Sequence, residues 1–83
     1  MTQQTSIEAY YSLKNLGDRQ LMVYTALEVL KEACNLDIAE YLHKPINTVT
    51  PRTNELVKSG PVVEAEKKIN LITHKKVIYW RIK

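Results

Sequence analysis

The hydrophobic residues of the chain recur at helical spacing up to about residue 59 and at strand spacing after it. The clearest helical stripe occupies positions i, i+3, i+4 and i+7 and consists of Val23, Ala26, Leu27 and Leu30. Because residues at this spacing share one face of an α-helix, the pattern predicts a core-facing helix over about residues 19–33. No Gly or Pro interrupts this stretch, and Asp18 is a good N-cap for it.

The N-terminal segment carries signals for an earlier helix. Residues 1–4 are polar, and we expect them to be flexible. Thr5 and Glu8 fit a capping box, in which the Thr hydroxyl accepts a hydrogen bond from the Glu8 amide and the carboxylate reaches back. The segment therefore predicts a helix that continues to about Lys14. Gly17 follows as a stop signal that is free to take a left-handed conformation.

A short third helix is predicted over about residues 36–43, with Asn35 as its cap. Its core face is formed by Ile38, Ala39 and Leu42. The pair Lys44-Pro45 ends this helix, because Pro cannot donate a backbone hydrogen bond.

A fourth helix is predicted to end at Ser59-Gly60, since Gly is favoured just after a helix. Its core face holds Ile46, Val49, Thr53 and Leu56 at helical spacing. Pro51 leaves two alternatives for its start, because Pro is tolerated in the first turn of a helix and disfavoured in its interior. Either the helix begins before Pro51, or regular helix begins at Thr50 and residues 46–49 form a lead-in turn.

After Gly60 the hydrophobic period changes to two, which predicts two β-strands. The first strand alternates hydrophobic and acidic residues around Val63. The second strand has an inward face made of Ile78, Trp80 and Ile82. We expect Trp80 to pack in the core between sheet and helices. The connection over residues 67–76 is long for a hairpin and has Lys residues at both ends.

Composition limits the class of protein. The chain has 83 residues, of which 45% are hydrophobic and 25% charged, and this predicts one globular domain over residues 5–83. One cysteine, Cys34, allows no internal disulfide, and with two His residues we expect no metal and no cofactor. No hydrophobic run is long enough for a membrane span and no signal sequence is visible, so we expect a cytoplasmic protein.

The sequence contains no arrangement that is typical of an enzyme. No Ser-His-Asp or Cys-His set occurs in a suitable context, and Gly17 and Gly60 are isolated, so there is no Gly-rich phosphate loop. No small-molecule ligand is evident either. We therefore expect a binding protein and not a catalyst.

The charges are distributed unevenly along the chain. Residues 1–42 hold three basic and six acidic side chains, whereas residues 43–83 hold nine basic and three acidic ones. Such an asymmetry indicates a face that binds a polyanion. A solvated basic surface without a partner would give the same pattern, so charge alone leaves both alternatives open.

The predicted order of elements is helix, helix, short helix, tight turn, helix and hairpin. This is the order of a winged helix-turn-helix. The predicted fold class is therefore α+β and mainly α, with three to four helices and a C-terminal two-stranded β-hairpin, the wing. In this design the helix after the turn enters the DNA major groove, and the wing brings cations to neighbouring phosphates.

Residues of this region resemble a known group of proteins. Residues 35–42 are similar to the first helix of the motif in winged-helix regulators, and residues 46–63 to the recognition helix and the first wing strand. The stretch Val49-Thr50-Pro51-Arg52, with Asn54-Glu55-Leu56 and a later Trp80-Arg81, resembles small phage and prophage winged helix-turn-helix proteins of the MarR-like superfamily.

The resemblance covers about residues 18–83 and implies a transcriptional regulator that binds double-stranded DNA. The chain departs from the group at Pro61, where Leu is usual, and in a wing connection that is richer in Ile and Leu. It also lacks the long dimerisation helices of full MarR regulators. If the chain forms a homodimer, the first helix with Tyr10 and Tyr11 is the expected contact.

The recognition helix is expected over about residues 47–58 and the basic wing over residues 67–76. Side chains proposed to read base edges are Asn47, Thr48, Thr50, Pro51, Arg52 and Glu55. For Glu55, pairing with Arg52 or Lys58 on its own helix is favoured over reading cytosine. Side chains proposed to contact phosphates are Lys44, Lys58, Lys67, Lys68, His74, Lys75 and Lys76.

A second interpretation belongs to a different class of function. Winged helices also serve as protein–protein interaction modules, for example in a phage protein that binds a host factor. The acidic first half of the chain would then be the functional face. The fold does not decide between the two interpretations.

Overall fold

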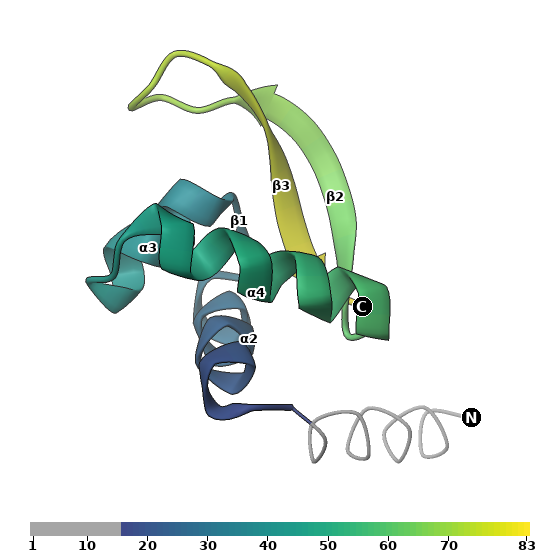
Figure 1. The fold of residues 1–83 in the computed structure, drawn as a ribbon. Helices are drawn as coiled ribbons and strands as arrows, with labels where there is room; N and C mark the ends of the chain where they lie inside the picture. Colours follow the sequence, from purple (N-terminus) through teal and green to yellow (C-terminus); the bar gives the residue numbers. More distant parts are fainter. Residues whose placement is uncertain (1–15) are drawn as a thin grey trace.

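The structure of the chain is a computed structural model that describes residues 16–83. In that part of the chain, three helices precede an antiparallel β-hairpin, and a short third strand completes a winged-helix-like α+β fold (Figure 1). The predicted first helix, which begins at Thr5 and includes Tyr10 and Tyr11, lies outside the described residues.

Helix α2 (Asp18–Leu30) carries the hydrophobic stripe that the sequence predicts. Val23, Ala26 and Leu27 are buried, and Leu30 packs against them at the edge of the core. The predicted cap is wrong, because Gly17 is the N-cap and Asp18 lies in the first turn. There the negative charge of Asp18 interacts favourably with the positive end of the helix dipole. Gly17 has φ −70° and does not take the expected left-handed conformation.

The predicted end of α2 is also wrong, since the helix stops at Leu30 and Lys31 has φ 71°. Residues Glu32–Ala33 form strand β1 and pair with the second strand of the hairpin, Glu32 opposite Arg81 and Ala33 opposite Trp80. Local helix propensity favoured three more helical residues, Lys31 to Ala33. The sheet edge supplies ladder hydrogen bonds and brings Ala33 into the core, and this tertiary gain overrides the propensity.

Helix α3 (Asn35–Leu42) begins one residue before its predicted start, with Cys34 as the N-cap in place of Asn35. The Cys34 amide donates to Asp37 Oδ2 over 3.4 Å, so the carboxylate occupies the place of a capping acceptor. Ile38 and Ala39 are buried as predicted. His43 ends the helix in a left-handed conformation, φ 56°, which turns the chain toward the next helix.

Helix α4 (Ile46–Ser59) begins before Pro51, which decides between the two alternatives. Because Pro51 and Asn47 are both exposed, the carbonyl that loses its helical partner at Pro51 can bind water. Val49, Thr53 and Leu56 are buried as predicted, but Ile46 is 46% exposed and does not belong to the core face. Gly60 closes the helix with φ 109°, a conformation that favours Gly.

The hairpin consists of β2 (Val62–Ile69) and β3 (Lys76–Ile82) in a sheet of order β1-β3-β2. Both strands extend further than predicted, so that Ile69 pairs with Lys76. The connection is therefore shorter than the predicted residues 67–76. An irregularity between Glu64 and Glu66 interrupts the register and, as a β-bulge does, bends the strand.

The core lies between the three helices and the lower part of the sheet, and it includes Leu27, Ile38, Leu56 and Val62. Trp80 of the central strand β3 is 9% exposed and belongs to this core, which confirms its predicted place. The upper part of the hairpin extends beyond the helices and bends over α3 and α4 (Figure 1). We call this hairpin the wing.

Candidate nucleic-acid interface

One face of α4 points away from the core. Residues at positions i, i+4, i+7 and i+11 share this face, and all of them are exposed; they are Asn47, Pro51, Asn54 and Lys58. We call this set the outer face of α4. It lies opposite Val49 and Leu56, which are almost fully buried. Core packing thus holds the inner side of the helix, while the Asn amide and Lys ammonium groups of the outer face are exposed to solvent.

Arg52 and Glu55 lie on the flank of α4 that faces α2. Arg52 Nη2 forms an ion pair with Glu55 Oε2 over 3.2 Å. Gln20 of α2 donates from Nε2 to Glu55 Oε1 over 2.7 Å. Of the two partners for Glu55 that the sequence left open, Arg52 and Lys58, the structure shows Arg52. The hydrogen bond from Gln20 to Glu55 joins α4 to α2.

Two Thr residues proposed as base readers are half-buried. Thr50 Oγ1 donates to the Ile46 carbonyl over 3.2 Å, and Thr48 borders a shallow depression that also includes Arg19 and Lys44. Their hydroxyls therefore lie at the margins of the outer face. Arg19, at the start of α2, was not among the phosphate contacts proposed from the sequence.

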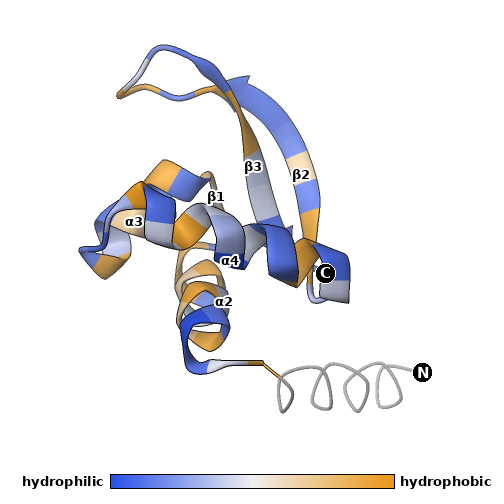
Figure 2. Cartoon of the chain, in the orientation of Figure 1, coloured by the Kyte–Doolittle hydropathy of each residue, from blue (hydrophilic) through white to orange (hydrophobic). Residues whose placement is uncertain are grey.

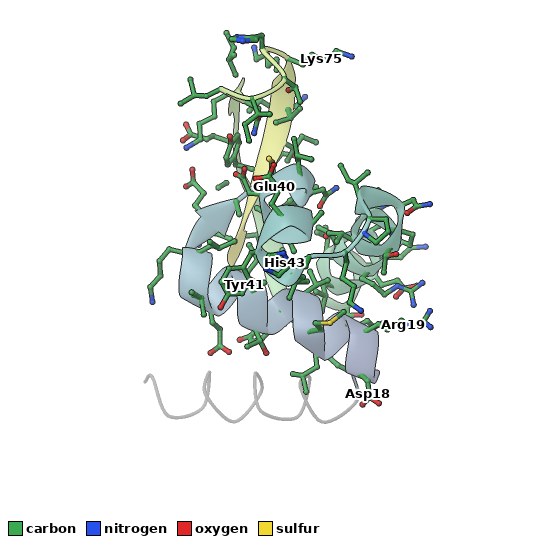
Figure 3. The ribbon with its side chains drawn as sticks, turned by 90° about the vertical axis from the view of Figure 1, so that its left-hand side faces the viewer. Asp18, Arg19, Glu40, Tyr41, His43 and Lys75 are labelled. Atoms are coloured by element: carbon green, nitrogen blue, oxygen red, sulfur yellow. The ribbon has the colours of Figure 1, made fainter. Side chains whose placement is uncertain are left out.

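The wing presents a row of cations. Lys67, Lys75 and Lys76 are exposed, and among residues 16–83 none of the three forms an ion pair. Figure 3 shows Lys75 at the end of the wing and Arg19 at the start of α2, with both side chains directed to the side on which α4 lies. His74 has a left-handed backbone, φ 58°, in the turn between the strands.

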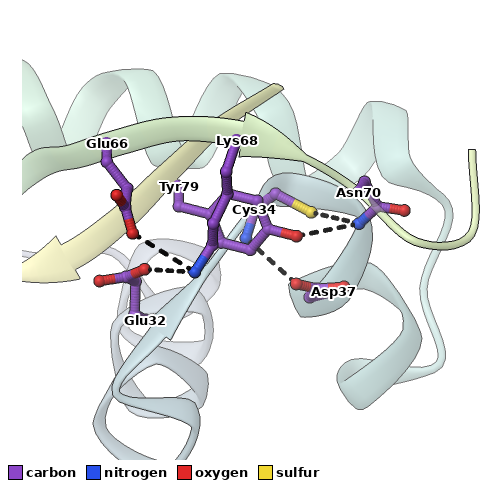
Figure 4. Close-up of polar contacts among 7 residues, drawn as sticks. All are labelled: Glu32, Cys34, Asp37, Glu66, Lys68, Asn70 and Tyr79. Atoms are coloured by element: carbon purple, nitrogen blue, oxygen red, sulfur yellow. Dashed lines mark hydrogen bonds and ion pairs between the residues drawn. The ribbon is translucent and has the colours of Figure 1, made fainter. Parts of the chain in front are cut away.

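Lys68 is held differently from its neighbours. Its Nζ lies 2.8 Å from Glu32 Oε2 and 3.5 Å from Glu66 Oε1, and 4.3 Å from the centre of the Tyr79 ring (Figure 4). The hydrogen bond between Lys68 and Glu32 raises the pKa of Lys68 and lowers the pKa of Glu32. Lys68 thus links β2 to β1, and two carboxylates at the protein surface partly compensate its charge.

A groove of about 480 Å³ separates the wing from the helices. Its lining includes Ile46 and Asn54 of α4, Thr73 and Lys75 of the wing turn, and Trp80 at its base. The outer face of α4 and the turn of the wing are therefore the two rims of one concave surface. The surface of a double-stranded nucleic acid alternates grooves with ridges of phosphate, and a concave protein surface with two rims can fit against such ridges.

Comparison with known proteins supports the fold. No family model matches the chain. No curated protein matches it either. A solved structure described as a "possible transcriptional regulator" from Methanosarcina mazei Go1 superposes with a TM-score of 0.68 at 15% sequence identity. The match covers 94% of this chain and 65% of the Methanosarcina chain, so the present chain spans less than two thirds of that protein's length. At this identity the likeness shows a shared winged-helix-like fold.

Asn70 is the structural residue of the wing that sequence reasoning missed. Its side chain is 3% exposed, and its Nδ2 donates to Cys34 Sγ over 3.2 Å and to the Tyr79 hydroxyl over 3.3 Å (Figure 4). Its Oδ1 accepts from the amides of Ile72 and Thr73. A lone Asn between two Lys-rich strand ends is a signal for such an Asx turn.

Burial also changes the chemistry of the tyrosines beside these groups. Desolvation raises the pKa of Tyr79, whose hydroxyl accepts the hydrogen bond from Asn70. Desolvation likewise raises the pKa of Tyr24 in α2, with a further contribution from the negative charge of Glu28. Both phenols therefore remain neutral at physiological pH and act as structural groups.

The described residues bear on two other kinds of site. Residues 16–83 contain no cluster of three His, Cys, Asp or Glu side chains that could hold a metal ion. Each helix in the same range is too short or too polar to span a bilayer.

Proposed function

We propose that the protein binds double-stranded DNA sequence-specifically and regulates transcription, with α4 in the major groove and the wing over the phosphate backbone. The observation that carries this proposal is the outer face of α4, which is exposed along its length and has cations beside its start and across the groove. Arg19 and Lys44 lie beside the start of the helix, and Lys75 lies across the groove from Asn54.

The geometry ranks the base-reading candidates. Asn47 is exposed in the first turn of α4, the part of a recognition helix that contacts base edges, and Asn can form a bidentate pair with adenine. Asn54 has the same chemistry two turns later, and we add it to the candidates. Arg52 would have to break its ion pair with Glu55 before it could contact guanine. Reading a base therefore costs Arg52 more free energy than it costs Asn47 or Asn54.

The phosphate contacts follow from exposure and pairing. We assign Lys44, Lys58, Lys67, Lys75 and Lys76 to the backbone, because all of them are exposed. His74 in the wing turn is exposed as well and remains a candidate. Lys68 contributes least, since Glu32 and Glu66 already neutralise it.

The wider setting rests on the sequence resemblance. We infer a phage-type regulator of the MarR-like superfamily that acts in the cytoplasm as a single domain over residues 5–83. A homodimer with contacts through Tyr10 and Tyr11 would place two copies of α4 on two half-sites, which is how many helix-turn-helix proteins bind.

The proposal is tested by selecting genomic fragments with the purified protein at low and near-physiological salt. Specific binding predicts an enriched motif that survives the higher salt, because base contacts depend less on counterion release than phosphate contacts do. A palindromic motif, together with a dimer mass by light scattering, would establish the symmetry. Fragments that bind at low salt only and share no motif would contradict the proposal and favour the protein-interaction module.

Removal of single wing lysines distinguishes free cations from compensated ones. Lys76→Ala is expected to weaken binding to all duplexes similarly and to make the slope of log K against log salt shallower by about one. Lys68→Ala is expected to change the slope less, because its charge is paired with Glu32. The measurement is a salt titration by fluorescence anisotropy.

The matched control is Lys31→Ala, which removes an exposed cation at the end of α2. It should leave the slope unchanged. Equal slopes for the Lys76→Ala variant and the parent protein would contradict the proposal that the wing contacts phosphates through Lys76.

A further inference from the structure

The end of the wing is hydrophobic and exposed to solvent. Ile69 is 62%, Leu71 87% and Ile72 58% exposed, and we call these three residues the wing tip. Figure 2 shows the chain changing from orange to blue around this turn, where the hydrophobic residues give way to the basic ones. Exposing three neighbouring aliphatic side chains is unfavourable in water, so this arrangement indicates a partner that covers them.

The wing tip is held in a defined shape. Asn70 Oδ1 accepts hydrogen bonds from the amides of Ile72, at 2.9 Å, and Thr73, at 3.1 Å. The Asn70 amide donates to the Lys75 carbonyl over 2.9 Å, and the His74 amide donates to the Asn70 carbonyl over 2.8 Å. Because Asn70 is itself anchored to Cys34 and Tyr79, Leu71 projects from a preorganised turn. Little conformational freedom is then lost when it inserts into a partner.

The surroundings of the wing tip indicate the chemistry of that partner. The exposed cations Lys67, Lys75 and Lys76 lie on both sides of the hydrophobic turn. A hydrophobic centre between positive charges complements a duplex groove, where stacked bases lie between two rows of phosphate. An anionic lipid surface has a related pattern, but Asn70 and Thr73, which flank Leu71 and Ile72 in the chain, line the same groove as Asn54 of the outer face of α4. One duplex can therefore contact both the wing tip and the outer face of α4.

We propose that Leu71, supported by Ile72, is a wedge that enters the DNA minor groove beside the major groove occupied by α4. There it partly unstacks a base step and bends the duplex, as inserted aliphatic side chains do. This inference rests on the proposed DNA-binding function. It adds to that function a recognition of deformable steps, such as pyrimidine–purine steps, at positions where no hydrogen bond reads a base.

The test compares two duplexes of about 30 base pairs that are identical except for one central mismatched pair. A mismatch makes unstacking easier, so a wedge binds the mismatched duplex more tightly, whereas contacts to phosphates are the same in both. We expect the parent protein to prefer the mismatched duplex by about 10-fold or more, measured by fluorescence anisotropy. Leu71→Ala should bind both duplexes about equally, and Leu71→Phe, which keeps a hydrophobic wedge, should retain the preference.

Leu21→Ala is the matched control, since Leu21 is an exposed Leu of α2; it should keep the preference of the parent protein for the mismatched duplex.

Failure to bind either duplex at low salt would overturn both the DNA-binding function and the wedge. Binding without a preference for the mismatch would overturn the wedge alone. An undiminished preference in Leu71→Ala would remove Leu71 from that role. Leu71-dependent sedimentation with phosphatidylglycerol vesicles, without a mismatch preference, would replace DNA by a lipid surface as the partner of the tip.

Discussion

Trp80→Ala is expected to lower the free energy of unfolding by roughly 3–5 kcal/mol. Trp80 is 9% exposed and lies in the central strand, opposite Ala33 of β1 and Glu64 of β2. It packs with residues of all three described helices in one core. Its removal leaves a cavity in this core, and a buried cavity adds to the lost transfer energy. Urea denaturation followed by far-ultraviolet circular dichroism measures the effect.

This loss is about half of the stability expected for a chain of 83 residues, at on the order of 0.1 kcal/mol per residue. Trp80→Phe therefore accompanies it as a milder variant that should remain folded with a smaller loss. Tyr41→Ala removes an exposed aromatic side chain and should change stability by only about 0.5 kcal/mol or less. A Trp80→Ala protein that is as stable as the parent and has lost DNA binding would mean that Trp80 is a contact residue.

Asn47→Ala is expected to weaken binding to the selected DNA motif by about 10- to 100-fold, which corresponds to roughly 1–3 kcal/mol for a bidentate base contact. Its side chain is exposed in the first turn of α4 and forms no hydrogen bond within residues 16–83. The substitution should therefore leave stability nearly unchanged. Binding to unrelated duplexes should also stay the same, because phosphate contacts supply that affinity.

Two comparisons make the Asn47 result specific. Arg52→Ala should cost less specific affinity than Asn47→Ala, since Arg52 is already paired with Glu55. Thr25→Ala, a substitution at an exposed position of α2, should have no effect on binding. If Asn47→Ala and Thr25→Ala bind the motif equally well, the first turn of α4 does not read bases, and the assignment of the recognition helix would have to change.

The winged-helix architecture could be anticipated because its signals are local. The stripe around Leu27 and the buried face of Val49 and Leu56 each repeat at helical spacing, and such a repeat specifies which side of a helix must leave water. The change to a period of two after Gly60 likewise identified the hairpin. Ile46 was misplaced because its spacing fits the core face, but the helix begins there, beyond the edge of the core.

The candidate interface could be anticipated only in part. Exposure of Asn47 and Pro51 follows from the helical repeat of α4, so the sequence placed them on the outer face. The sequence could not show that Lys68 is compensated, because its partner Glu32 is distant in the chain and meets it only through the sheet. It could not show the anchoring of Asn70 either, since Cys34 and Tyr79 come from two other segments.

The sequence by itself determined the order of elements, the buried faces of α2 and α4, the core position of Trp80 and the concentration of positive charge in the second half. These depend on periodicity, on composition and on residues close together in the chain. Only the tertiary structure decided that Glu32–Ala33 leave the helix to pair with β3, that α4 begins before Pro51, and that Asn70 shapes the wing tip. In the first case the strand pairing outweighs a local helix preference of under about 1 kcal/mol per residue, and in the second the buried face of α4 outweighs a cost of about 3 kcal/mol for an interior Pro. In the third, Asn70 meets groups from distant segments.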